Sequence, residues 1–173
     1  MILLPLALLI GSGVGNWNTD AAKAKVAFSV KGPLGTVHGE FTGLKATIQF
    51  DVKNPGAGSI TASIDANTVS TGIGMRNHHL KSEEQFLNTD KYREISFHSK
   101  KIEKTGNGYI ASGDLTIKGV SKPVRIPFTF APGGKNGVFK GQFVIKREDF
   151  NIGKPGGSTG DDVTISLEVP VSQ

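Results

Sequence analysis

The sequence of 173 residues has no cysteine, which excludes disulfides, thiolate metal ligands and cysteine nucleophiles at once. Arginine is sparse, and basic residues do not interleave with aromatic residues as they do in RNA-binding segments, so we expect no nucleic-acid partner. The net charge of +5 and the pI of about 9.5 suit weak attraction to anionic lipid headgroups, which leaves transient contact with a membrane surface open. Most lysines, however, alternate singly with apolar residues, and we expect them on the solvated face of a sheet.

Residue patterns typical of catalysis and metal binding are also missing. The sequence has no G-x-S-x-G motif, and the glycines between 153 and 160 lack the Lys-Ser/Thr ending of a phosphate loop. His78 and His79 are neighbours, whereas two histidines that chelate one ion from a helix are four residues apart. We therefore predict no catalytic residue, no metal site and no cofactor, and we interpret the chain as a protein that is not an enzyme.

The N-terminus is the one segment without a globular pattern. Residues 1–10 read MILLPLALLI, and the small-residue stretch GSGVG follows. An apolar run followed by small residues is typical of a secretory signal peptide, and ten residues are too few to span a bilayer. We predict a signal peptide over residues 1–15, one domain over residues 16–173, and a periplasmic or secreted location. A buried N-terminal strand is the alternative.

From residue 22 onward, apolar and polar residues alternate in about eight or nine short segments. The 23 glycines and 8 prolines gather mostly between these segments, as hairpin connections require. Strands with one apolar and one polar face are typical of antiparallel sheets, and closure into a barrel removes the exposed edges. We predict an all-β, up-and-down, lipocalin-like antiparallel barrel of about eight strands; a two-sheet sandwich is the alternative.

One stretch departs from the alternation. Between Asp65 and Ile95 the apolar residues take helical spacing, and Asn77 is a residue type that caps helix starts. We expect a helical insertion near residues 77–92, placed as a lid or plug over one end of the barrel.

The inward-facing positions are almost wholly apolar and mix phenylalanines with glycines and alanines. An eight-stranded barrel either fills its interior with side chains or holds one small ligand, and the composition allows both. If a cavity exists, a long hydrocarbon tail with a polar head at the opening suits it, because each buried methylene contributes about 0.8 kcal/mol. The predicted lining residues are Val26, Phe28, Phe41, Ile48, Phe50, Ala62, Ile64, Leu80, Phe86, Phe97, Leu115, Phe128, Phe143 and Ile165. For the headgroup we predict Arg76, Arg147 and Lys154, provided that the glycine-rich loop lies at the open end.

Four stretches carry a resemblance to a known family: residues 26–41, RNHHLKS at 76–82 running on to residue 92, GDLTIKGVSKPV at 113–124, and KREDFNIG at 146–153. Together they resemble the YceI-like family, the bacterial periplasmic polyisoprenoid-binding type, over nearly the whole chain after about Trp17. The resemblance implies a lipocalin-like barrel with a helical insertion and an elongated apolar tunnel for an isoprenoid or similar amphiphilic chain. It also implies a periplasmic or secreted location and no catalytic residues. Arg93 follows Tyr92 where the family often has proline.

Two functions follow as hypotheses. In the first, the chain sequesters or carries a long-chain amphiphile, such as a polyisoprenoid, a quinone-like molecule or a fatty-acid-type lipid. In the second, the barrel is filled by its own side chains and acts as a periplasmic stress-response or protein-interaction module. Either function is compatible with a monomer or a homodimer.

Overall fold

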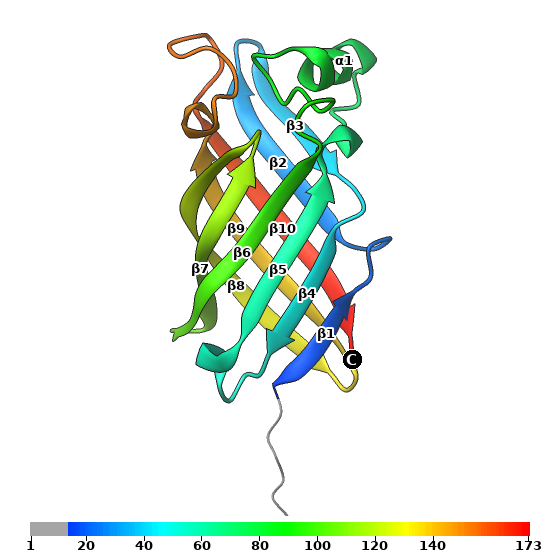
Figure 1. Cartoon of the computed structure of the whole chain (residues 1–173), viewed down its shortest axis with the longest axis vertical. Coiled ribbons are helices and arrows are strands. Elements are labelled where there is room, and N and C mark those ends of the chain that lie inside the picture. The colour runs from blue at the N-terminus through cyan, green and yellow to red at the C-terminus, as the bar shows by residue number, and fades with distance from the viewer. Residues whose placement is uncertain (1–13) are drawn as a thin grey trace, which may run out of the picture.

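The computed structural model describes residues 14–173, which form a barrel of antiparallel strands with one α-helix at one end (Figure 1). The first strands are β1 (Gly15–Thr19), β2 (Lys25–Gly32), β3 (Gly35–Phe41), β4 (Lys45–Phe50) and β5 (Ser59–Asp65). After the helix α1 (Gly74–Ser82) follow β6 (Glu94–Thr105), β7 (Gly108–Ile117), β8 (Val120–Gly133), β9 (Asn136–Lys146) and β10 (Asp162–Ser172). Three short 3₁₀ turns are η1 (Pro55–Ala57), η2 (Ala66–Thr68) and η3 (Arg147–Phe150).

The sheet closes on itself. Its strand order is β1-β4-β5-β6-β7-β8-β9-β10-β2-β3, and β1 also pairs with β10. Strands β1 and β2 both pair with β10. Its residues Val163 to Glu168 pair with β2, and Val171 and Ser172 pair with β1. In the same way, residues 42–44 separate β3 from β4, and these two strands pair with β2 and β1 respectively. With each interrupted pair counted as one long strand, the barrel has eight strands in up-and-down order, which confirms the predicted fold class and excludes the sandwich.

One seam of the barrel has few backbone hydrogen bonds. The outer edge of β3 meets the chain after β5 through a single isolated bridge, in which Glu40 and Ser70 exchange N–H···O bonds of 2.8 and 2.9 Å. Below it, the Thr68 hydroxyl donates to the Thr42 carbonyl and accepts from the Thr42 amide. The chain beyond this seam leaves the sheet to form α1.

The helical insertion is present but shorter than predicted. The helix begins at Gly74 and ends at Ser82, and residues 83–93 fold back as turns. Asn77 lies inside the helix and does not cap it; its side-chain oxygen accepts hydrogen bonds of 2.8 Å from the Thr71 amide and hydroxyl. The backbone turns away at Glu83, which is extended, so the apolar residues that follow reach the barrel from turns.

The turn segment is fixed to the barrel end by a tight hairpin. Lys118 and Gly119 connect β7 to β8 with φ of 51° and 73°, as a two-residue type I′ turn requires. The Tyr92 ring packs on Gly119 so closely that a Cβ there would lie 2.9 Å from the ring. A side chain at Gly119 would therefore displace the chain that leads from α1 into β6.

The interior is packed at one end. A group of six aromatic side chains, here called the floor cluster, meets around Phe50 with ring-centroid distances of 4.4–5.8 Å. Its members are Trp17, Phe50, Tyr109, Phe128, Phe130 and Phe139. The indole N–H of Trp17 donates to the Phe50 carbonyl at 3.1 Å, which satisfies a buried donor. The barrel end away from α1 is therefore filled.

The predicted signal peptide is not tested by the structure. Residues 1–13 lie outside the described residues, and β1 begins at Gly15 beside Phe50 of β4. Within residues 14–173 no helix has the length and apolarity needed to cross a bilayer.

Candidate ligand-binding cavity

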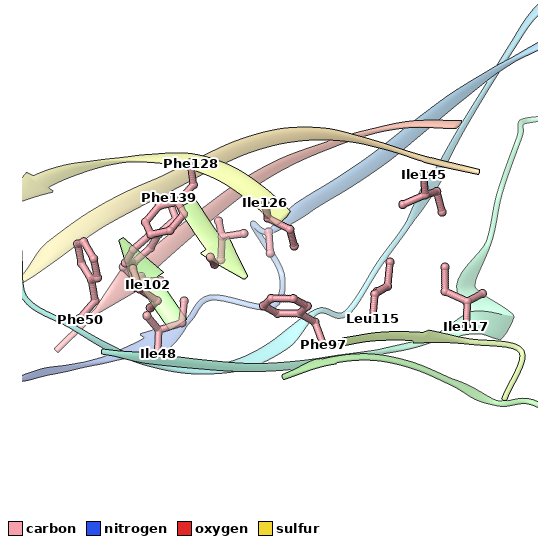
Figure 2. Close-up of a cluster of buried hydrophobic side chains, with 14 of the residues drawn as sticks. Ile48, Phe50, Phe97, Ile102, Leu115, Ile117, Ile126, Phe128, Phe139 and Ile145 are labelled. Carbon is pink, nitrogen blue, oxygen red and sulfur yellow. The ribbon is translucent and has the colours of Figure 1, made fainter. Parts of the chain in front are cut away.

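The other end of the barrel encloses a cavity of about 490 Å³. It extends from the floor cluster to the end where α1, the tip of the β2–β3 hairpin and the loop of residues 151–161 lie, here called the mouth (Figure 1). Figure 2 shows that the interior is packed at one end and hollow at the other. Phe50, Phe128 and Phe139 gather at one side of the view, whereas Ile145 faces Leu115 and Ile117 across a space. The volume lies within the usual range for small-molecule pockets, about 300–1,000 Å³.

The cavity wall is built by the alternation along the strands, since every second residue of each strand points inward. In β10 these residues are Val163, Ile165, Leu167 and Val169, and their partners in β9 are Ile145, Phe143, Gly141 and Phe139. All eight line the cavity, so the register between the two strands produces a continuous apolar strip.

Nearly all of the residues predicted from the sequence to line a cavity do so. The structure brings together Val26, Phe28, Phe41, Ile48, Ala62, Ile64, Leu80, Phe86, Phe97, Leu115, Phe128, Phe143 and Ile165. The exception is Phe50, which is 2% exposed and lies outside the lining. Its inward orientation was predicted correctly, but its neighbours in the floor cluster surround it on every side and leave no space beside its ring.

Small inward residues do not all create space. A Cβ on Gly39 would lie 2.3 Å from the ring of Phe28, its cross-strand partner, so this ring fills the room that the glycine leaves. Ala62, between Ala46 of β4 and Phe97 of β6, borders the cavity directly. The hollow part therefore depends on alanines and branched aliphatic residues in the middle of the barrel.

The mouth is roofed by two segments that hold one another. Leu80 of α1 and the following Phe86 and Leu87 cover one side of the cavity, and residues 152–154 and 157–159 cover the other. The ammonium of Lys118 donates to the carbonyl of Asn151 at 2.8 Å and to that of Glu84, and the Gly153 amide donates to the Gln85 carbonyl. Lys118 thus ties both roof segments to the β7–β8 hairpin.

Arg147 holds the glycine-rich loop in place. Its guanidinium donates to the carbonyls of Gly160 at 2.8 Å, Ile152 at 2.7 Å, Thr159 at 2.9 Å and Lys154 at 3.4 Å. The residue is 6% exposed and lines the cavity. The loop has no repetitive structure of its own, so these bonds to one side chain give it a defined shape.

The three predicted headgroup residues are separated. Arg147 and Lys154 both line the cavity at the mouth, where the glycine-rich loop was expected. Arg76 is half-buried on α1 and lies outside the lining. Lys154 is exposed on the loop whose carbonyls Arg147 binds.

Sequence reasoning missed the polar residues beside Arg147, which are Gln85, Ser158 and Thr159. They lie in turns, where no periodicity indicates the direction of a side chain. The two adjacent histidines, His78 and His79, have ring centroids 6.2 Å apart, and residues 14–173 contain no group of three or more metal-ligating side chains.

The sequence and the fold are both similar to those of known proteins. The model of the YceI-like domain matches residues 17–171. Protein YceI of Escherichia coli is 34% identical over 139 residues, which are 77% of this chain and 72% of the relative. The crystal structure of Burkholderia cenocepacia BcnA superposes with a TM-score of 0.83 at 30% identity, covering 90% of this chain and 99% of that one. A polyisoprenoid-binding domain from Saccharophagus degradans shares the fold, with a TM-score of 0.70 at 16% identity over 90% of this chain and 97% of that one.

Proposed function

The chain belongs to the YceI-like family, and we propose that it binds a long-chain amphiphile, such as a polyisoprenoid, a quinone-like molecule or a fatty-acid-type lipid, in the barrel cavity. The observation that carries this proposal is the cavity of about 490 Å³ inside the barrel, whose wall is formed almost entirely by Val, Ile, Leu, Phe and Ala side chains. The polyisoprenoid-binding relative of the same fold supports the choice of ligand class.

The wall favours a hydrocarbon chain over a sugar or a nucleotide. A buried polar ligand group without a hydrogen-bond partner costs about 1–3 kcal/mol in proteins, whereas each buried methylene contributes about 0.8 kcal/mol. Polar side chains line the cavity chiefly at the mouth. The tail therefore lies in the barrel with its far end toward the floor cluster, and the head stays at the mouth.

We propose a binding and carrier role rather than catalysis, in the periplasm or outside the cell. The apolar stretch of residues 1–10 and the small residues that follow it support export. Sequestering a lipid tail needs only an apolar interior for the tail and polar residues beside the head, and the cavity has both.

A carrier must exchange its ligand with a membrane, and the mouth has exposed apolar residues suited to that contact. Leu34 at the tip of the β2–β3 hairpin is 102% exposed, and Ile73 and Met75 at the start of α1 are 49% and 74% exposed. Both elements lie at the mouth (Figure 1). Together with the net charge of +5, they support transient docking of this end on an anionic membrane surface.

The direct test is native mass spectrometry of the protein purified from the compartment to which it is exported, followed by organic extraction and lipid analysis. We expect a stoichiometric apolar ligand that leaves on extraction, and the same spectrum reports whether the protein is a monomer or a dimer. The emptied protein should then take up a fluorescent long-chain probe. A protein that carries no lipid and takes up no probe would overturn the proposal.

A further inference from the structure

The cavity has one polar end, and its charged residues are all of one sign. The charged residues in its lining are Lys140, Arg147 and Lys154, and no aspartate or glutamate of residues 14–173 contributes to it. Lys140 does not present its charge to the cavity, because its side chain is 61% exposed on the outer face of β9, opposite Glu168 of β10. The charge presented to the cavity therefore comes from Arg147 and Lys154, next to Gln85, Ser158 and Thr159.

The positive charge of Arg147 is held in position and is only partly offset. All four acceptors within hydrogen-bond distance are neutral backbone carbonyls, and the guanidinium has five N–H donors. The Glu148 carboxylate forms an ion pair with Nη2 at 3.7 Å but accepts no hydrogen bond from it, and because the Glu148 side chain is 33% exposed it offsets the charge only in part. The Arg147 side chain is only 7% exposed, so water screens its charge poorly.

The two aspartates at the end of the loop, Asp161 and Asp162, are engaged elsewhere. One Asp161 carboxylate oxygen accepts the Glu148 amide at 3.0 Å, and the Asp162 carboxylate pairs with Lys146. That pairing raises the pKa of Lys146, chiefly through its hydrogen bond to Asp162. Neither aspartate lines the cavity, so they do not neutralise its polar end.

We propose that this end selects amphiphiles with an anionic oxygen head, a carboxylate or a phosphate, over amphiphiles with the same tail and a neutral head. This inference rests on the proposed function and narrows its ligand class. Arg147 supplies a fixed, desolvated charge, and Lys154 supplies a mobile one at the rim. Charge-assisted hydrogen bonds of this kind are roughly twice as strong as neutral ones.

The test compares matched pairs that differ only in the head: hexadecanoic acid with hexadecan-1-ol, and farnesyl phosphate with farnesol. Affinities are measured by displacement of a fluorescent long-chain probe, at a pH well above the pKa of the carboxylic acid. We expect each anionic member to bind about tenfold more tightly than its alcohol, and this ratio to fall at high salt. Inorganic phosphate alone should not displace the probe, because the tail supplies most of the affinity.

The variant Lys154→Gln removes one charge without disturbing the carbonyl contacts of Arg147. It should lower the preference for both anionic ligands about threefold and leave the alcohols unchanged. Lys53→Gln, an exposed site at the far end of the barrel, is the control with the same change in net charge and should have no effect. Equal affinities for acid and alcohol, or equal effects of the two variants, would refute the headgroup preference alone. Failure of all four ligands to bind would refute the proposed function itself.

Discussion

The rings of Phe50 and Phe139 meet edge to face, with centroids 5.6 Å apart and an interplanar angle of 73°. Phe139 lines the cavity and Phe50 does not, so the boundary between the hollow and the filled parts of the barrel runs between these two rings. The depth available to a ligand tail is therefore set by the floor cluster, and not by the length of the strands.

Replacing Phe50 by alanine should extend the cavity toward the floor. The side chain is fully buried among four other rings, so we expect the free energy of unfolding to fall by about 3–5 kcal/mol, as for other buried phenylalanines. If the variant remains folded, the longest tail that it accepts should lengthen by several carbons. Denaturant unfolding and a series of ligands of increasing chain length measure the two effects, and an unchanged chain-length limit would contradict the assignment of Phe50 as the floor.

Ala62→Phe should fill the hollow part instead. Because Ala62 borders the cavity, the added ring has room, and stability should change by less than the about 1–3 kcal/mol typical of overpacking. Probe binding should weaken at least tenfold. Thr61→Phe is the matched control, because Thr61 is the preceding residue of β5 and points to solvent. A large loss of stability in Ala62→Phe with binding retained would show that the interior is a packed core.

Affinity should rise with tail length and then level off. The cavity of about 490 Å³ is closed at its inner end by the floor cluster, so it takes a tail of limited length. Each added methylene should contribute about 0.8 kcal/mol up to that length and little beyond it, where the tail leaves through the mouth. Isothermal titration with saturated fatty acids of increasing length checks this, and a steady gain well past the limit would mean that the barrel expands around its ligand.

The contacts of Asp65, at the end of β5 where the chain leaves the sheet, should contribute less to stability in acid. The Asp65 carboxylate accepts the Asn67 amide at 2.8 Å and pairs with Arg93 at 3.0 Å, and these contacts, the amide first, lower the pKa of Asp65. A lowered pKa stabilises the fold above the unfolded value, about 3.9, and this contribution disappears as the pH falls through the folded value. Asp65→Asn keeps an acceptor for the amide but loses the ion pair, so near neutral pH it should be less stable by at most about 1 kcal/mol.

Unfolding midpoints of Asp65→Asn and the wild type, measured across the acid range, test this contribution. The difference should begin to shrink below about pH 3.9, where the unfolded carboxylate takes up a proton, and should be lost once the pH falls below the lowered pKa of the folded state. A difference that stays constant down to low pH would show that the ion pair with Arg93 is not its cause.

Docking of the mouth on membranes should depend on its exposed apolar residues. The double variant Leu34→Ser and Met75→Ser should reduce co-sedimentation with vesicles that contain phosphatidylglycerol, and should slow ligand transfer from them. Val52→Ser, just after the floor end of β4 and 41% exposed in the wild type, removes exposed apolar surface at the opposite end of the barrel and should change neither. Equal binding by all three proteins would rule out this end as the docking site.

The barrel and most of its lining were predictable because both depend on a period of two. Alternation distinguishes inward from outward positions, which is sufficient for Ala62, Phe97 and Ile165. It carries no information on the height of a residue along the barrel axis, and for that reason Phe50 was predicted to line the cavity although it lies in the floor cluster.

The parts that sequence reasoning missed depend on contacts between distant segments. Asn77 is a residue type that caps helices, yet it binds Thr71 from within the helix, because the preceding loop folds over it. Arg147 was correctly expected at the mouth, but its four carbonyl partners come from a loop with no periodic pattern. Local residue preferences do not determine either arrangement.

The sparse seam between β3 and Ser70 has a kinetic consequence. Elsewhere the wall opens only by breaking a ladder of backbone hydrogen bonds, but here the Glu40–Ser70 bridge and the Thr42–Thr68 contacts are the links. A structure opens locally most often where it has the fewest hydrogen bonds. Amide protons along the outer edge of β3 should therefore exchange with solvent faster than those of β7 to β9. We expect a long tail, bound as proposed above, to load sideways through this seam between β3 and Ser70, at a rate that follows the opening of the seam rather than that of the roof.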